Sequence, residues 1–89
     1  MNSTNLKLLA KKIELLESIQ DIESFLGLFL TSKEVATILT RIEIVRRLDA
    51  GETQRKIAAD LQVGIQTVSR GVKPLQENLE EFKRILKCL

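Results

Sequence analysis

The 89-residue sequence has no histidine, tryptophan or tyrosine, and it has one cysteine and one proline. Without histidine, and without a glycine-rich phosphate loop or a serine-nucleophile elbow, no catalytic constellation is present. The lone Cys88 excludes a disulfide framework and a thiolate metal cluster. One proline and four glycines leave no room for a linker, so residues 1–89 are predicted to form one domain. We therefore expect a protein that is not an enzyme and binds no metal.

Long apolar runs are missing too. The longest, residues 25–30, is far too short to span a bilayer, and no stretch resembles a signal peptide. We therefore expect a cytoplasmic protein without a membrane partner. The net charge of only +2 excludes a protein that is positively charged over its whole surface, so any surface that binds nucleic acid has to be a local basic patch. Residues 51–75 are the most basic segment, and Arg46 and Arg47 just before them are expected to extend a basic patch.

Apolar residues are abundant in the first predicted helix, residues 4–20. They recur at intervals of three and four and cover more than half of the circumference. The stripe comprises Leu6, Leu8, Leu9, Ile13, Leu15, Leu16 and Ile19. A chain of this size cannot cover so wide a stripe, so the pattern predicts burial against a second copy in a homodimer. Mixed charges on the polar face disfavour the alternative of a membrane-surface helix.

The sequence predicts further helices and no strand. A short helix over 21–28, loosened at its end by Gly27, precedes a helix over 32–50. The capping box Thr31–Glu34 begins that helix and Gly51 ends it. The last predicted helix covers residues 77–87. The fold class is therefore all-α, with dimerisation helices in residues 1–50, a helix-turn-helix in 53–75 and a C-terminal helix in 76–89.

The helix-turn-helix is predicted from two short amphipathic patterns around a turn. Thr53 is expected to cap a helix over 54–61, and a second helix begins at Ile65. The small Ala58 suits two helices that cross at a steep angle. Pro74 is expected to force Lys73 away from helical angles, so that the second helix ends early unless it kinks.

The outward face of the second helix is polar and cationic, without a carboxylate. It comprises Gln66, Thr67, Ser69, Arg70 and Lys73. Such a face suits the major groove of DNA, which admits one helix and offers base acceptors and phosphates. Two amphipathic helices around a glycine turn also fit a helical protein-interaction module, which remains the alternative outside DNA binding.

Four segments together resemble the bacterial tryptophan repressor family. They are Leu-Phe-Leu-Thr at 28–31, Thr-Arg-Ile-Glu-Ile-Val at 40–45, Gly-Glu-Thr-Gln-Arg at 51–55 and Gly-Ile-Gln-Thr-Val-Ser-Arg-Gly at 64–71. The likeness covers residues 20–89, and the segment ending in Ser-Arg-Gly is fairly specific. The resemblance implies a six-helix intertwined homodimer that represses transcription from a palindromic double-stranded DNA operator, with L-tryptophan as corepressor.

The resemblance also implies the ligand-binding residues. Arg41 and Arg70 would lie on the two sides of the indole ring, and Arg70 would also meet the ligand carboxylate, as guanidinium chemistry permits. Thr31 would help to hold the carboxylate, and Gly71 would leave room for the ring. The backbone carbonyls of Leu28 and Leu30 from the other subunit would accept hydrogen bonds from the ammonium group.

For DNA, the resemblance and the exposed face indicate residues on both helices of the motif. Arg55 is the candidate for a guanine edge, because a guanidinium can bridge O6 and N7. Thr67 and Ser69 suit phosphates. The full set is Gln54, Arg55, Gly64, Ile65, Gln66, Thr67, Ser69 and Lys73.

Three departures from the family pattern bear on these expectations. Pro74 stands where the family usually has a serine that contacts the ligand ammonium, which leaves another indole compound, or a regulator without a ligand, as alternatives. Gln62 replaces a glycine that is common in the turn, and this is expected to require only a locally different backbone. One residue fewer separates Gly51 from Gln54, which would rotate the helix-turn-helix slightly.

Overall fold

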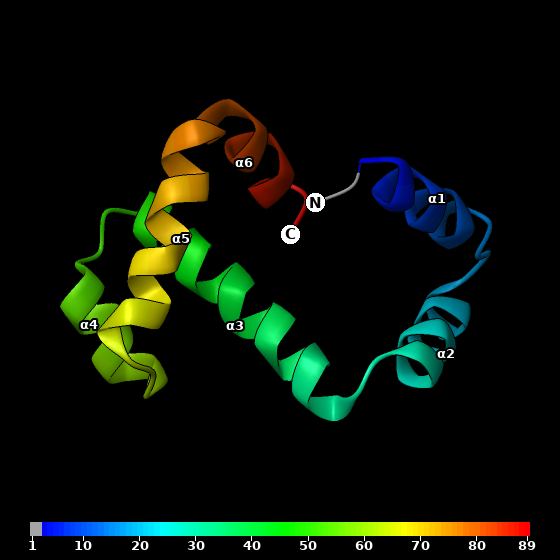
Figure 1. Ribbon diagram of the computed structural model, residues 1–89, viewed down its shortest axis with the longest axis horizontal. Coiled ribbons are helices and arrows are strands. Elements are labelled where there is room, and N and C mark those ends of the chain that lie inside the picture. The colour runs from blue at the N-terminus through cyan, green and yellow to red at the C-terminus, as the bar shows by residue number, and fades with distance from the viewer. Residues whose placement is uncertain (1–2) are drawn as a thin grey trace. The chain divides into compact units, whose positions relative to one another are not determined.

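The computed structural model describes residues 3–89, and this part of the chain is helical with no strand. The helices are α1 (Ser3–Glu14), α2 (Ile19–Phe29), α3 (Ser32–Asp49), α4 (Gln54–Leu61), α5 (Ile65–Glu77) and α6 (Leu79–Leu86) (Figure 1). The prediction of an all-α protein is therefore confirmed. The chain divides into two compact units, residues 1–35 and 36–89, which are described separately. None of the helices within residues 3–89 is both long and apolar enough to cross a membrane.

In the first unit, α1 is shorter than predicted. It ends at Glu14 instead of residue 20, and α2 begins at Ile19 instead of residue 21. Ser18 causes the break, because its backbone is extended and its hydroxyl accepts a hydrogen bond from the Asp21 N–H at 3.1 Å, as an N-cap does. Gly27 does not loosen the end of α2, which continues to Phe29.

The apolar side chains of α1 and α2 are mostly exposed. Neither helix contains a buried residue. Large exposed apolar side chains on and between them are Leu6, Leu8, Leu9, Ile13, Leu15, Ile19, Ile22, Leu26, Leu28 and Phe29. The excess of apolar surface that the sequence predicts is therefore present in the fold.

The two ends of α3 follow the local signals of the sequence. At its start, the Thr31 N–H donates to Glu34 Oε1 at 2.8 Å and the Glu34 N–H donates to Thr31 Oγ1 at 3.1 Å, which confirms the capping box. At its end, Gly51 has a φ of 89°. The Gly51 N–H donates to the Leu48 carbonyl and the Glu52 N–H to the Arg47 carbonyl, the two bonds of a Schellman motif.

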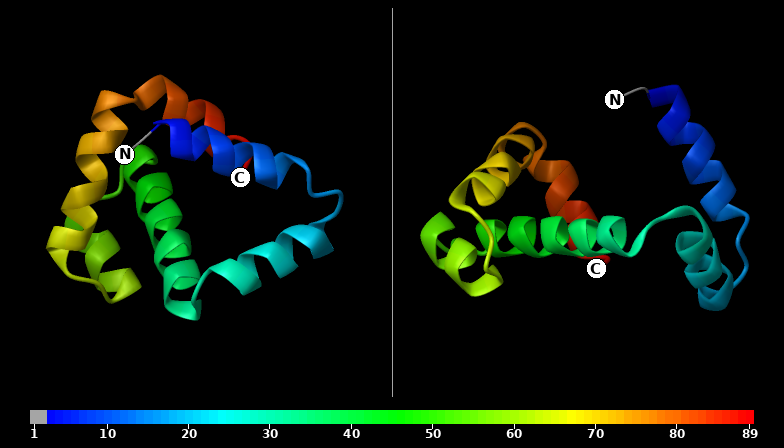
Figure 2. Two further views of the ribbon diagram at one scale, coloured as in Figure 1. Left: turned by 45° about the vertical axis from the view of Figure 1, so that its right-hand side comes forward. Right: turned by 60° about the horizontal axis from the view of Figure 1, so that its bottom comes forward.

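The second unit is built around the pair of α4 and α5, which cross near the C-terminal end of α3 in Figures 1 and 2. Ile44 of α3, Ile57 and Ala58 of α4, and Val68 of α5 form one buried cluster. Ile57 and Val68 are completely buried. The predicted helix-turn-helix and the small contact residue Ala58 are thus both found in the structure, and α3 supplies the third wall of the core.

The turn between α4 and α5 holds Gln62 in the left-handed conformation, with φ 57° and ψ 44°. The Gln62 N–H donates to the Ala59 carbonyl and the Val63 N–H to the Ala58 carbonyl, so α4 also ends in a Schellman motif. This corrects the expectation of a different backbone at Gln62. The residue adopts the conformation that favours glycine, because the motif requires it.

Pro74 does not end α5. The helix runs through Lys73 and Pro74 to Glu77, which corrects the prediction of an early end. Proline inside a helix costs about 3 kcal/mol, because it cannot donate to the carbonyl four residues earlier and its ring crowds that carbonyl. Burial of Leu75, which is 8% exposed, and contact with α6 offset this cost. The helix-turn-helix therefore extends two residues beyond the predicted 53–75, and α6 begins at Leu79 instead of residue 77.

Candidate functional site

The outward face of α5 is exposed along its length. The exposed members of the predicted DNA-binding set are Arg55, Gly64, Ile65, Gln66, Thr67, Ser69 and Lys73, whereas Gln54 is half-buried. Arg70 is exposed on the same helix. Burial of Val68 fixes this orientation, since the side chains on either side of it must then point away from the core.

Two guanidinium groups of the helix-turn-helix remain available to an external acceptor. Among residues 3–89, Arg55 and Arg70 have no hydrogen-bond or ion-pair partner. Lys73 lies 3.9 Å from the Glu77 carboxylate, but both side chains are mostly exposed, so this pair is weak. Glu77 belongs to α5 because the helix continues past Pro74, and it adds a carboxylate one turn beyond the predicted polar face.

Gln54 and Ser69 are brought together although 15 residues separate them. Ser69 Oγ lies 2.7 Å from Gln54 Oε1 and 3.0 Å from the Ile65 carbonyl oxygen. A hydroxyl has one proton, so it donates to one of these acceptors at a time. The contact ties the start of α4 to the middle of α5.

Three residues predicted for the ligand lie where α5 meets α3. A β-carbon built at Gly71 would stand 3.1 Å from Ile44 Cγ2 and 3.5 Å from Leu48 Cδ1. Glycine at this position therefore lets α5 approach α3 closely, a packing role that the sequence did not reveal. Arg41 precedes Ile44 by three residues and so shares the same side of α3, while Arg70 adjoins Gly71. Both arginines are exposed.

The other residues predicted for the ligand belong to the first unit. Thr31 is exposed and serves as the cap of α3, where its hydroxyl proton is still available to another acceptor. Hydrogen bonding by the Thr31 backbone and hydroxyl lowers the pKa of the Glu34 carboxyl. Leu28 is exposed near the end of α2, and Leu30 caps that helix with its N–H on the Leu26 carbonyl.

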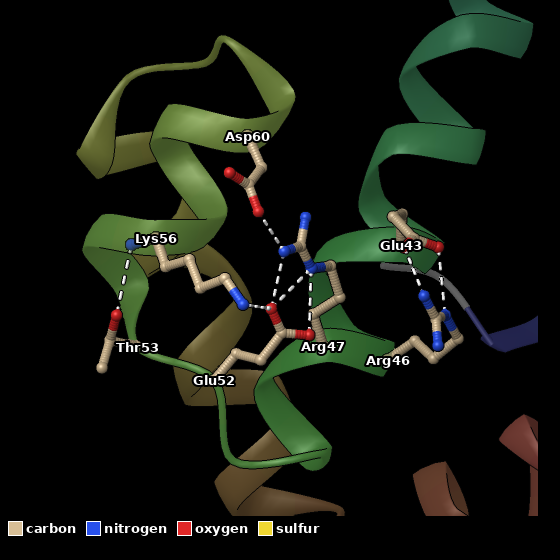
Figure 3. Close-up of polar contacts among 7 residues, drawn as sticks. All are labelled: Glu43, Arg46, Arg47, Glu52, Thr53, Lys56 and Asp60. Atoms are coloured by element: carbon tan, nitrogen blue, oxygen red, sulfur yellow. Dashed lines mark hydrogen bonds and ion pairs between the residues drawn. The ribbon is translucent and has the colours of Figure 1, made fainter.

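Arg47 does not extend a basic patch as predicted. Its guanidinium donates to both carboxylate oxygens of Glu52, at 2.6–3.0 Å, and to Oδ2 of Asp60 (Figure 3). Lys56 adds a 3.6 Å contact to the Glu52 carboxylate. The hydrogen bonds from Arg47 lower the pKa of Glu52, and its acceptors raise the pKa of Arg47. This ion cluster joins the end of α3 to both ends of α4.

Arg46, the second arginine expected in the patch, points elsewhere. It pairs with Glu43 one turn back on α3 (Figure 3), and its hydrogen bond lowers the pKa of the Glu43 carboxyl. The cations of the helix-turn-helix without a carboxylate partner among residues 3–89 are therefore Arg55 and Arg70, whereas Arg46 and Arg47 are already paired with carboxylates.

A sequence signal for the ion cluster existed. Gly51 marks the end of α3, so residues 47 and 52 occupy the two Schellman positions whose side chains meet, where an apolar pair is common. Here an arginine and a glutamate replace that pair.

Residues 3–89 contain no group of three histidine, cysteine, aspartate or glutamate side chains arranged to hold a metal ion.

Comparison with known proteins identifies a family for this chain. The family model described as "Trp repressor protein" matches residues 4–89. A "Trp operon repressor homolog" from Vibrio cholerae is 37% identical over 68 residues, which cover 75% of this chain and 66% of the relative. A homolog of the same name from Vibrio parahaemolyticus is 37% identical over 71 residues, which cover 79% of this chain and 69% of the relative. One from Photobacterium profundum is 37% identical over 65 residues, which cover 72% of this chain and 63% of the relative.

The chain thus spans about two thirds of the length of the curated relatives that it matches. No solved structure gave a significant match. The match to the family model nevertheless extends over almost the whole chain, from α1 to the last residue. The chain belongs to the Trp repressor protein family.

Proposed function

We propose that this protein is a transcriptional repressor that binds a palindromic operator as a homodimer, with L-tryptophan or a related indole compound as corepressor. The observation that carries the proposal is the exposed face of α5, on which Arg70 has no acceptor among residues 3–89. Membership of the family and the printed names of the relatives support a repressor function.

DNA binding would use α5 in the major groove. Gln66 and Thr67 lie in the first turn of α5, the part of such a helix that meets base edges, and Arg55 stands in the first turn of α4. Unpaired arginines bind guanine edges and phosphates without first breaking an internal ion pair. The link between Gln54 and Ser69 keeps both helices of the motif in one arrangement during binding.

A homodimer is supported by the uncovered apolar surface. Ten large apolar side chains on and between α1 and α2 are exposed within one chain. Exposed apolar side chains on α3 and α6, namely Ile38, Leu39, Leu79 and Ile85, add to this surface. A second copy that buries these residues accounts for the surface without another partner.

The ligand site would form around Arg41 and Arg70. Both guanidinium groups are exposed and lie on the two helices that meet at Gly71, so they can stack on an aromatic ring and pair with a carboxylate. Pro74 has neither a hydroxyl nor an N–H, so it offers an ammonium group nothing in place of the family's serine. Indole acids without an amino group are therefore included in the ligand class.

The DNA proposal is tested by selection from a pool of random-sequence duplexes, with and without 1 mM L-tryptophan. We expect a palindromic consensus and a loss of binding in Arg55→Ala and Thr67→Ala. A matched control is Lys83→Ala on α6. A helical protein-interaction module predicts instead that no consensus emerges and that the α4 and α5 substitutions change nothing.

The ligand proposal is tested by fluorescence, because the protein has no tryptophan or tyrosine of its own. Indole emission is followed while protein is titrated into L-tryptophan and, separately, into indole-3-propionate. Saturation at one ligand per chain that is lost in Arg70→Ala, with the oligomeric state unchanged, supports the site. No spectral change at millimolar ligand refutes it and leaves a DNA-binding regulator without a corepressor.

A further inference from the structure

The ion cluster around Arg47 differs from the other ion pairs of the chain. Among residues 3–89 it is the only one that connects two helices, since the pairs Arg46–Glu43 and Lys73–Glu77 each lie within one helix. The Arg47 side chain is 12% exposed, against 59% for Arg46. A guanidinium held by two carboxylates and largely covered by protein keeps one geometry, whereas an exposed pair is readily screened by solvent.

The other members of the ion cluster, the two carboxylates that hold Arg47 and the lysine that contacts Glu52, lie at defined places before and along α4. Glu52 precedes the N-cap residue Thr53, Lys56 lies in the first turn and Asp60 in the last turn (Figure 3). Contacts at both ends of a short helix fix its direction as well as its position.

Apolar packing defines the orientation of a helix less sharply than these polar contacts do. α4 contributes Ile57 and Ala58 to the core, and the hydrophobic effect that holds them is not directional. The planar fork of an arginine, in contrast, binds a carboxylate only in certain orientations. Arg47, Glu52 and Asp60, together with the contact between Gln54 and Ser69, therefore add directional contacts to the apolar packing of α4.

We propose that Arg47 is a positioning residue for DNA recognition, which acts through Glu52 and Asp60 to orient α4 and thereby Gln54 and Arg55. The inference rests on the proposed function, because it concerns how the helix-turn-helix meets DNA. Arg47 itself makes no contact with DNA in this proposal, since its Nε and Nη2 groups donate to the two carboxylates and its side chain is only 12% exposed. Recognition of sequence thus depends on a residue of α3 that lies outside the helix-turn-helix.

The test compares Arg47→Lys with Arg46→Lys. Both retain the positive charge, but only the first removes the forked contact between helices, while the second changes a pair within α3. The probes are the duplex selected by the unaltered protein and a shuffled duplex of the same composition. Binding is measured over a range of salt concentrations, at a temperature where circular dichroism shows every variant folded.

We expect Arg47→Lys to lower affinity for the selected duplex about tenfold, which is the effect of misplacing one bidentate base contact. Affinity for the shuffled duplex and the salt dependence should stay unchanged, because no phosphate contact is lost. Arg46→Lys should bind both duplexes like the unaltered protein. If Arg47 only stabilised the fold, its substitution would change the affinities for the selected and the shuffled duplex alike.

A second variant, Asp60→Ala, addresses the case in which Arg47→Lys does not fold. Asp60 lies in the last turn of α4, where a carboxylate opposes the helix dipole, so its loss removes one arm of the cluster without weakening the helix. We expect a smaller loss in the same direction, confined to the selected duplex.

Three outcomes would overturn the inference. Equal losses on both duplexes with a shallower salt dependence would show that Arg47 contacts phosphate directly. Unchanged affinity in Arg47→Lys and Asp60→Ala would show that packing alone orients α4. Failure of the unaltered protein to select any duplex would refute the proposed function as well, and so is distinguishable from the first two.

Discussion

The left-handed residue Gln62 gives a prediction whose size follows from backbone geometry. At φ 57° and ψ 44°, a residue with a β-carbon pays about 1–2 kcal/mol, because that carbon crowds the following carbonyl oxygen. Glycine avoids this crowding but loses about 0.5–1 kcal/mol through the greater freedom of the unfolded chain. The Gln62→Gly variant should therefore be more stable by about 0.5–1 kcal/mol.

Urea unfolding followed by circular dichroism measures this difference. With a slope of about 1.5 kcal/mol per M of urea, the midpoint should rise by about 0.5 M while the slope stays the same. Protein concentration must be identical in all samples, because association contributes to the stability of an oligomer. The control is Gln62→Ala, which keeps the β-carbon and should show no such gain.

The Gln62 side chain is exposed and makes no hydrogen bond within residues 3–89, so its removal should cost little. A midpoint that is unchanged or lower in Gln62→Gly would refute the reasoning. It would mean that the turn does not hold this residue in the left-handed conformation, or that the side chain stabilises the turn. An equal rise in Gln62→Ala would show that loss of the side chain, and not relief of the backbone, is responsible.

Three further predictions concern the core, the start of α3 and acid stability. Val68→Ala should cost about 2 kcal/mol in urea unfolding, because it opens a cavity at a completely buried position, whereas Val72→Ala, at a half-buried position, should cost less. Thr31→Ala should cost about 1 kcal/mol in urea unfolding, because the cap hydrogen bond from the Glu34 N–H is lost; unchanged stability would refute the capping-box account. The pKa of Glu34 should rise only part of the way toward its ordinary value in an NMR titration, because the Thr31 N–H, the larger cause of its lowering, remains. Because the pKa of Glu52 is lowered in the folded protein, its ionised carboxylate stabilises the fold above the ordinary carboxyl pKa, and this stabilisation is lost as pH falls through the lowered value. Glu52→Gln should therefore lose less stability than the unaltered protein on acidification. Parallel plots of unfolding free energy against pH for the two proteins would contradict this.

Local sequence signals predicted most of the helix boundaries around the helix-turn-helix. Thr31, Gly51 and Thr53 act through hydrogen bonds or backbone conformations within a few residues of themselves, so their effect is visible in the sequence. The exception was Ser18, a cap of the same kind. It was missed because the apolar period continues through Leu15 and Ile19 and favoured one unbroken helix.

The candidate site was predicted less completely than the helices. The sequence identified an exposed polar face on α5, and the structure exposes Gln66, Thr67 and Arg70 there. It did not indicate that Gln54 and Ser69 contact each other. Such a pairing depends on the crossing of α4 and α5 in space, which the residue pattern of either helix leaves open.

The sequence by itself determined the all-α class, the caps and the helix-turn-helix, because these follow from periodicity and from hydrogen bonds between near neighbours. Only the tertiary structure decided that α5 passes through Pro74, since burial of Leu75 and contact with α6 offset the lost hydrogen bond. It also decided that Gly71 packs against Ile44 and that Arg47 is paired with Asp60, 13 residues away. Contacts between distant residues exist only after the helices have packed, and for that reason one-dimensional patterns did not predict them.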